Sequence, residues 1–310
     1  MQAKGLDIVT SGPSTNSTVH ATVSVVIPTF ERVDELVVTL DKIRSCQPAP
    51  AEIIVHVDGG DRVTARALRE FRGADLKVLH SQKRLGPGGG RNRAIAAALH
   101  EIVVSLDDDS FPLDGDFFAR VTTLIDRFPM AAVVGATIYH RDEPLQASVD
   151  EVVLSADFVG CGCVYRRSAF LGTLGYQPLT MAYGTEEVDV ALQLHDQEAT
   201  ILLSRALRVR HDTDRSHQAS ARVTAAHITN TALLAWLRYP VTSCWFGAVQ
   251  VASRVLWPIK NGRVAGILTG LVAIPIVIWR HRHARHPIRQ ITLERFLRLR
   301  RAAIDPHFDA

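Results

Sequence analysis

The chain has few cysteines, little net charge and no long apolar run. Only four of its 310 residues are cysteine, which is too few for a scaffold held by disulfides. Lysine and arginine number 35 against 32 acidic residues, and a net charge of +3 does not indicate a nucleic-acid-binding protein. The longest apolar run, Val264–Trp279, contains Pro275 and is shorter than the roughly 20 residues of a membrane-spanning helix. With 47% hydrophobic residues, the chain is typical of a globular protein.

Residues 1–21 are polar, rich in serine and threonine, and have no apolar segment of the kind found in secretory signal peptides. We therefore expect residues 1–21 to form a flexible leader and the protein to be cytoplasmic. The small number of cysteines agrees with a reducing compartment.

From residue 22 onward, short apolar runs alternate with segments of helical spacing. Four continuous apolar runs predict strands that are buried on both faces of a sheet: Val23–Thr29, Glu52–Val57, Leu76–Leu79 and Glu101–Leu106. Segments with apolar residues at helical spacing lie between them. The pattern predicts an α/β fold, with a mostly parallel open sheet and flanking helices.

After residue 112 the alternation is less regular. Further strands are predicted at Ala131–Ile138, Phe158–Tyr165, Ile201–Leu203 and Leu207–Val209. A long helix is predicted at Ala219–Leu237, and apolar helical segments follow it.

Polar residues follow three of the predicted strands, at Thr29–Arg32, Asp58–Asp61 and Asp107–Asp109. Open parallel sheets bind ligands at the carboxyl ends of their strands, so we expect these segments to meet at one edge. Adjacent carboxylates repel one another unless a cation or solvent relieves them, and hard divalent cations prefer oxygen ligands. Asp107–Asp109 therefore predict a metal–diphosphate site, and a solvated acidic turn is the alternative.

Three acids lie close together at Glu186, Glu187 and Asp189, before an apolar helical pattern. Acids in a first helical turn complement the helix dipole, which is a sufficient structural reason for them. One of these carboxylates would also serve as a general base if it faced a cleft.

A glycine-rich segment, GPGGGRNR, begins at Gly86. Glycines at a helix start let phosphates approach backbone N–H groups, and Arg91 or Arg93 would pair with a phosphate. The dinucleotide-binding fingerprint fails here, because Arg91 stands where its third glycine is required. A flexible loop with surface arginines is the alternative.

His211 follows an apolar run, and Cys161 and Cys163 alternate along a predicted strand. A lone histidine is more often structural or solvated than a metal ligand, so both interpretations of His211 stay open. Packing of small residues is the favoured interpretation of the two cysteines.

In this order, the motifs resemble those of the family-2 glycosyltransferases, which are inverting enzymes with the Rossmann-like GT-A fold. The resemblance covers residues 23–217 through the segments VSVVIPTFER, EIIVHVDGGD, GPGGGRNRA, VSLDDDSFP, YGTEEVDVALQL and VRHDTDRSH. The residues beyond, including NTALLAWLRYP, look like the C-terminal helices of the rhamnosyltransferase-like branch. The resemblance implies a GT-A domain at 22–218, with a nucleotide-sugar half at 22–111 and an acceptor half at 112–218. A C-terminal helical region would follow at 219–310.

The resemblance also implies roles for individual residues. The donor would be bound by Pro28, Thr29, Glu31, Asp58, Arg91, Asp107 and Asp108. The metal would be held by Asp109, Asp107 and His211. Glu187 would be the catalytic base, with Glu186 as the alternative, and Asp189 would orient the acceptor or hold the helix.

The implied activity is a metal-dependent, inverting transfer of a hexosyl or deoxyhexosyl group, with Mn²⁺ or Mg²⁺ as the ion. The donor would be a UDP-, dTDP- or GDP-linked sugar, and the acceptor a saccharide, a lipid-linked sugar or a small molecule. Assembly of cell-surface polysaccharide or glycolipid is the expected setting. Gly59 and Gly60 stand where the family has an acid and a serine, which puts the ribose contacts in doubt.

Two alternatives to this activity remain. A sugar-nucleotide pyrophosphorylase would need a glycine-rich loop with Arg or Lys after the first strand, where this chain has PTFER. A catalytically degenerate, membrane-associated scaffold with the same fold is the other alternative, although the acids at 107–109 and 186–189 argue against it.

The C-terminal part combines apolar segments with a basic tail. Val241–Ile259 and Val264–Trp279 are apolar, and residues 280–301 hold eight arginines and one acid. The pattern predicts helices that lie in a membrane interface, on the inner face of the cell membrane, through residues 241–301. A buried helical layer or a homodimer interface is the alternative.

Overall fold

The computed structural model describes residues 20–302, apart from residues 72, 74, 180, 182, 183 and 214–219. The predicted leader at 1–21 therefore lies almost entirely outside the described residues. The strands are β1 His20–Thr29, β2 Ala49–Val57, β3 Leu76–His80, β4 Ile102–Leu106, β5 Ser110–Pro112, β6 Ala131–His140, β7 Val152–Leu154, β8 Gly162–Arg166 and β9 Thr200–His211. The helices are α1 Val33–Arg44, α2 Arg62–Glu70, α3 Gly86–Ala97, α4 Phe117–Arg127, α5 Arg167–Leu171, α6 Glu186–Asp196, α7 Ala221–Arg238, α8 Cys244–Lys260, α9 Ile267–Arg280 and α10 Gln290–Ala302. Short 3₁₀ helices lie at Val241–Ser243 and Arg282–Ala284.

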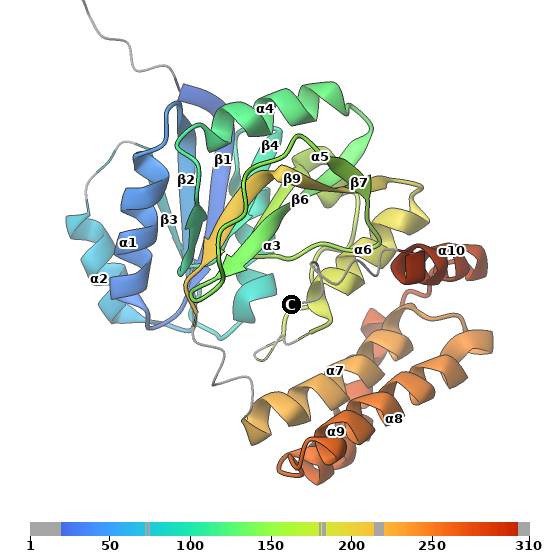
Figure 1. Ribbon diagram of the computed structural model, residues 1–310. Coiled ribbons are helices and arrows are strands. Elements are labelled where there is room, and N and C mark those ends of the chain that lie inside the picture. The colour runs from blue at the N-terminus through green and yellow to red at the C-terminus, as the bar shows by residue number, and fades with distance from the viewer. Residues whose placement is uncertain are drawn as a thin grey trace, which may run out of the picture.

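Within the described residues, nine strands form one sheet in the order β3-β2-β1-β4-β8-β6-β9-β5, and β7 pairs with β9 (Figure 1). Pairing is parallel from β3 to β4, where Val25 of β1 lies between Ile53 of β2 and Val104 of β4. β8 runs antiparallel to β4 and β6, whereas β6 and β9 are parallel. The predicted α/β fold, with a mostly parallel open sheet and flanking helices, is confirmed.

Two details of the sheet differ from the prediction. The segments expected as separate strands at 201–203 and 207–209 form one strand, β9, whose register with β6 shifts between Ala136 and Thr137. The polar residues between the two segments interrupt the apolar pattern, but backbone pairing continues through a bulge of the kind that absorbs an irregular register. β8 begins at Gly162 rather than at Phe158, because the N–H of Gly162 closes a turn onto the carbonyl of Val159.

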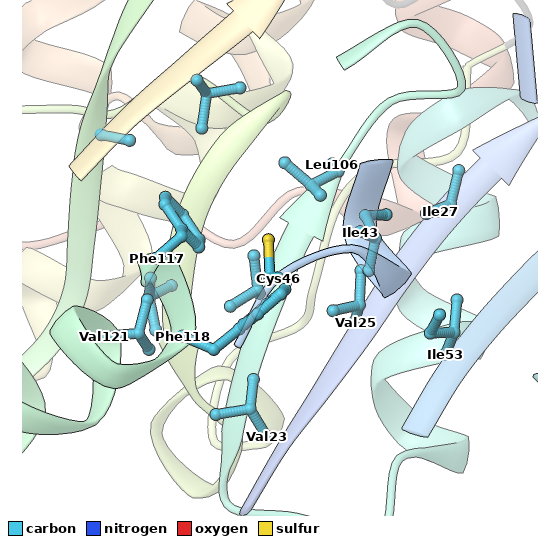
Figure 2. Close-up of a cluster of buried hydrophobic side chains, with 14 of the residues drawn as sticks. Val23, Val25, Ile27, Ile43, Cys46, Ile53, Leu106, Phe117, Phe118 and Val121 are labelled. Carbon is cyan, nitrogen blue, oxygen red and sulfur yellow. The ribbon is translucent and has the colours of Figure 1, made fainter. Parts of the chain in front are cut away.

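Helices cover both faces of the sheet. Along β1, Val23, Val25 and Ile27 pack with residues of α1, α2 and α4, whereas Val26 packs with residues of α3, α5 and α6. Figure 2 shows part of the first of these clusters, to which β1 contributes Val23, Val25 and Ile27 and α4 contributes Phe117. Because successive side chains of a strand point to opposite faces, a strand covered on both sides must be apolar throughout.

The helices α7, α8 and α9 form a layer of their own, below the sheet in Figure 1. α7 contacts α6 on one side and α8 and α9 on the other. α10 returns to α6, where the ring of Phe296 meets the ring of His195 at 5.8 Å. None of the described helices is long and apolar enough to cross a lipid bilayer.

Candidate active site

A cavity of about 1070 Å³ opens at the carboxyl edge of the sheet, where β1, β2 and β4 end. The sheet extends from β1 through β2 and β3 on one side and through β4 on the other. This edge is therefore a switch point, where open α/β sheets bind their ligands. The predicted residues that line the cavity are Pro28, Thr29, Asp58, Arg91, Asp107, Asp108, Asp109, Glu186, Glu187 and His211. Glu31 and Asp189 are not among its lining residues.

Asp108 and Asp109 share the guanidinium group of Arg32, which ends the predicted polar segment Thr29–Arg32 but was given no role of its own. Nη1 of Arg32 lies 2.9 Å from Oδ1 of Asp108, and Nη2 lies 2.8 Å from Oδ2 of Asp109. Thr29 donates a hydrogen bond of 2.9 Å to the other oxygen of Asp108. Burial and the neighbouring carboxylates raise the pKa of Asp108 to about 7, against the opposing effect of Arg32. In Asp109, burial is outweighed by His211 and Arg32, which lower the pKa to about 2.

Strand β9 brings His211 to Asp109. His211 pairs with Ser110 across β5 and β9, and the N–H of Asp212 donates to the carbonyl of Asp109 at 2.8 Å. Nε2 of His211 consequently lies 3.2 Å from Oδ1 of Asp109. Burial would lower the pKa of His211, but the hydrogen bond to Asp109 and the charges of Asp107 and Asp109 raise it. Antiparallel pairing thus joins two motifs that are far apart in the sequence.

The acidic turn and His211 fit a divalent cation. Ligand atoms of Asp107, Cys161 and His211 lie within 4.8 Å of one another, and Asp109 approaches the same histidine. Carboxylate oxygens suit Mn²⁺ and Mg²⁺, whereas an imidazole nitrogen is more typical of transition-metal sites. The thiol of Cys161 is a soft ligand, which Mn²⁺ and Mg²⁺ use less readily than the carboxylate oxygens nearby. The residues that would hold the ion are therefore Asp107, Asp109 and His211.

Arg91, on α3, connects the acidic turn to α6. Its side chain is 2% exposed, and its Nε donates to the hydroxyl of Ser105 at 3.0 Å. It forms an ion pair with Asp107, and its Nη1 lies 3.8 Å from Oε1 of Glu186. Arg93 does not line the cavity and donates instead to the carbonyl of His80.

The glycines at the start of α3 are needed for close packing. A Cβ at Gly88 would lie 2.8 Å from both Oε2 of Glu186 and Cβ of Tyr176. A Cβ at Gly90 would lie 2.8 Å from Nδ1 of His56. Both glycines are buried, which gives this motif a structural reason apart from phosphate binding.

Glu186 and Glu187 begin α6, but their surroundings differ. Glu186 is 6% exposed, and burial together with the charge of Glu187 raises its pKa well above the usual value. Glu187 is half-buried, and its Oε1 accepts a hydrogen bond of 3.2 Å from the N–H of Gly160. Burial also raises the pKa of Glu187, with Arg91 opposing the shift. A carboxylate of raised pKa that faces a cavity has the properties of a general base.

Asp189 lies two residues beyond Glu187 on α6, and its carboxylate belongs to a different hydrogen-bond network. Arg238 of α7, which is 2% exposed, binds both oxygens of its carboxylate, and the Nη2–Oδ2 distance is 3.3 Å. Gln193 donates to the same carboxylate at 3.0 Å. Of the two predicted roles for Asp189, this placement favours holding the helix over orienting an acceptor.

The residues predicted to bind a nucleoside lie in two kinds of environment. Pro28 and Thr29 line the cavity directly. Asp58 also lines it, but its carboxylate accepts hydrogen bonds of 2.9 Å from the N–H groups of Leu85 and Gly86. Glu31 is exposed outside the lining residues, in a left-handed backbone conformation with φ of 56°.

Further lining residues were missed in the sequence. The guanidinium group of Arg84 lies 3.5 Å from the centre of the Phe30 ring, and both side chains line the cavity. Arg222 reaches the same cavity from α7. Phe30 lies within the segment Thr29–Arg32, which the sequence placed at this edge without giving Phe30 or Arg32 a role. No local pattern marks Arg84 or Arg222.

Comparison with known proteins agrees with this geometry. Residues 24–152 match the family model of glycosyl transferase family 2. The matched segment includes β1 to β4 and the acidic turn, and it ends before Glu186 and His211. The match extends over less than half of the chain. No curated protein sequence matches the chain.

Solved structures with a similar fold include a mannosyltransferase and two proteins in complex with a nucleotide or a nucleotide-sugar. A mannosyltransferase from Pyrobaculum calidifontis, in complex with GDP-Man and Mn²⁺, has 15% identity and a TM-score of 0.57, over 94% of this chain and 83% of that one. GalNAc-T7 with UDP, GalNAc and Mn²⁺ has 16% identity and a TM-score of 0.60, over 84% of this chain and 58% of that one. TarS residues 1–349 of S. aureus, in complex with UDP-GlcNAc, has 18% identity and a TM-score of 0.53, over 69% and 65%. The similarity confirms the GT-A fold.

Proposed function

We propose that the protein is a metal-dependent, inverting glycosyltransferase that moves a hexosyl or deoxyhexosyl group from a nucleotide-sugar to an acceptor hydroxyl. The observation that carries the proposal is one cavity in which Asp107, Asp109 and His211 face Arg91 and Glu187. The family match and the nucleotide-sugars bound to the similar structures support it.

The ion would be Mn²⁺ or Mg²⁺, held by Asp107, Asp109 and His211, and it would neutralise the diphosphate that leaves. Arg91 would supply a second positive charge close to the same diphosphate. Asp58, Pro28 and Thr29 would line the nucleoside part of the site. The chain's resemblance to the rhamnosyltransferase-like branch supports a deoxyhexosyl donor, with UDP, dTDP or GDP as the carrier.

Glu187 would act as the base. Its carboxylate would accept the proton of the acceptor hydroxyl as that oxygen bonds to the anomeric carbon and the bond to the diphosphate oxygen breaks. The attack from the opposite face inverts the anomeric configuration. The catalytic domain would be residues 22–218. The acceptor would be a saccharide or a lipid-linked sugar used in the assembly of the cell surface. All four cysteines are free, which supports a cytoplasmic setting.

Titration calorimetry of the purified protein with UDP, dTDP and GDP tests the donor site. With Mn²⁺ present, we expect one nucleotide to bind, and we expect EDTA to abolish binding. Asp109→Asn should weaken metal-dependent binding at least about tenfold, because it removes a charged ligand. Asp126→Asn, an equal charge change on the exposed face of α4, should bind like the wild type.

Equal binding in Mn²⁺ and in EDTA would contradict metal dependence while leaving the transfer activity in place. No binding of any nucleotide to a folded protein would favour the scaffold alternative. The first outcome therefore tests metal dependence alone, and the second tests whether the protein binds a nucleotide at all.

Gly160→Ala tests the positioning of the base. The added Cβ would lie 2.6 Å from Oε1 of Glu187 and 3.2 Å from Cζ of Arg91, so one of these groups must move. A displacement of about 1 Å at a reacting group costs on the order of 10²-fold in rate. We expect such a loss in kcat from initial-rate measurements, with Gly115→Ala as the control because its Cβ meets no atom within 4 Å. An unchanged kcat in Gly160→Ala would show that catalysis does not depend on the close approach of Gly160 to Glu187.

A further inference from the structure

The outer sides of α8 and α9 carry large apolar side chains that nothing in the described chain covers. Leu268 is 75% exposed and Trp245 67% exposed, values expected of surface polar residues rather than of these types. We call the whole set the α8–α9 face. It consists of Trp245, Val249, Leu256 and Ile259 of α8, and Leu268, Val272, Ile276 and Trp279 of α9.

The helices are exposed on one side because they pack on α7 with the other. A Cβ at Gly247 of α8 would lie 2.3 Å from Cβ of Ala235, and one at Gly270 of α9 would lie 2.9 Å from the carbonyl oxygen of Ala225. Thr229 of α7 donates to the carbonyl of Gly270 at 3.1 Å. These contacts fix which side of each helix meets α7.

Helical spacing then places the α8–α9 face away from α7. With about 3.6 residues per turn, Trp245 and Val249 lie on the side of α8 opposite Gly247. Leu268 and Val272 lie in the same way opposite Gly270 on α9. In Figure 1, both helices lie on the side of α7 that is away from the sheet.

The charge of this region has one sign. Residues 241–293 contain no acidic residue, and their seven basic residues are Arg254, Lys260, Arg263, Arg280, Arg282, Arg285 and Arg289. Arg289 forms ion pairs with Asp196 and Glu198, so the charge available to a partner comes from the other basic residues. Lys260 and Arg280 are exposed at the C-terminal ends of α8 and α9. The guanidinium of Arg282 lies 4.4 Å from the Trp279 ring, and that of Arg263 lies 5.4 Å from the Trp257 ring.

We propose that the α8–α9 face binds the surface of an anionic membrane. Apolar side chains would enter the headgroup–acyl boundary, tryptophans would lie at its level, and the basic residues would meet lipid phosphates. A second copy of the chain fits less well, because a two-fold interface brings the same basic surface of both copies together. α7 packs against α8 and α9 and also supplies Arg222 to the cavity. The same helix would therefore connect the membrane-binding face to the cavity.

Sedimentation with vesicles tests the proposal without any assumption about catalysis. We expect the full chain to bind phosphatidylcholine vesicles that contain phosphatidylglycerol, and to bind pure phosphatidylcholine far more weakly. Raising the salt concentration should weaken the anionic component, since exposed charges are screened.

Trp245→Ser and Leu268→Ser should each lower vesicle affinity at least about tenfold, because each removes an exposed apolar side chain that the membrane would bury. Val63→Ser and Met130→Ser are the matched controls, since these side chains are 73% and 81% exposed but lie on other parts of the surface. Lys260→Glu should weaken only binding to the anionic vesicles.

Equal loss of vesicle binding in the control variants would overturn the proposal. So would a chain that binds no vesicle but forms a dimer that Trp245→Ser dissociates, as measured by analytical ultracentrifugation. Loss of nucleotide binding would bear on the proposed function alone, because vesicle binding is measured without donor or metal.

Discussion

Glu187→Gln is expected to lower kcat by about 10²–10⁴-fold while the nucleotide still binds with wild-type affinity. The amide keeps the size and the hydrogen-bonding shape of the side chain, but it cannot accept the acceptor's proton. The hydrogen bond from the N–H of Gly160 to Oε1 can persist with the amide oxygen, so the site should keep its shape. Initial rates with saturating donor, together with calorimetry of the bound nucleotide, measure the two parts of this expectation.

Glu186→Gln separates the two candidate bases. Burial raises the pKa of Glu186 well above its usual value and so favours the neutral carboxyl group, which the amide resembles in size and in hydrogen bonding. We expect much smaller loss of kcat in this variant than in Glu187→Gln. Glu70→Gln, on the exposed surface of α2, should behave as the wild type. The reverse order of the two losses would assign the base to Glu186, and wild-type turnover in both variants would refute a carboxylate base on α6.

Arg238→Ala is expected to lower the free energy of unfolding by about 3–5 kcal/mol. The arginine is 2% exposed, and its removal would leave the buried carboxylate of Asp189 without its cation. The pair joins α6 to α7, so the loss should also loosen the C-terminal helices from the sheet. Denaturant unfolding followed by circular dichroism measures this change.

Arg127→Ala is the control for Arg238→Ala, because its ion pair with Asp150 is exposed and should contribute less than about 1 kcal/mol. If Arg238→Ala does not yield folded protein, Asp189→Asn supplies the measurement, since it leaves the arginine as the unpaired buried charge. A loss below about 1 kcal/mol in either Arg238→Ala or Asp189→Asn would show that the pair is not buried in solution.

The first half of the sheet could be predicted closely from the sequence. Runs such as Val23–Thr29 are apolar at every position because helices cover both faces of the strand. The later strands were harder to predict. β9 continues through a polar stretch, and only its pairing with β6 keeps the two apolar segments in one strand.

Some residues of the candidate site could likewise be predicted from the sequence, and others could not. The acids of the turn after β4 and of the first turn of α6 stand out in the sequence because their charge pattern is local. Arg32 does not stand out, and its ion pairs with Asp108 and Asp109 appear only when the ends of β1 and β4 lie side by side. The sequence left two roles open for Asp189, and its ion pair with Arg238 of the distant helix α7 favours the role of holding the helix.

The sequence by itself determined the α/β class, the edge of the sheet where the cavity opens, and ten of the residues that line the cavity. These three features follow from short-range patterns of apolar and charged residues. Such patterns are readable in the sequence because helices and strands place their side chains with the same periodicity in every protein. Only the tertiary structure decided that His211 meets Asp109, that Asp189 is held by Arg238, and that α8 and α9 leave an apolar face uncovered. Those outcomes depend on strand register and helix packing, where the contacts join residues far apart in the chain.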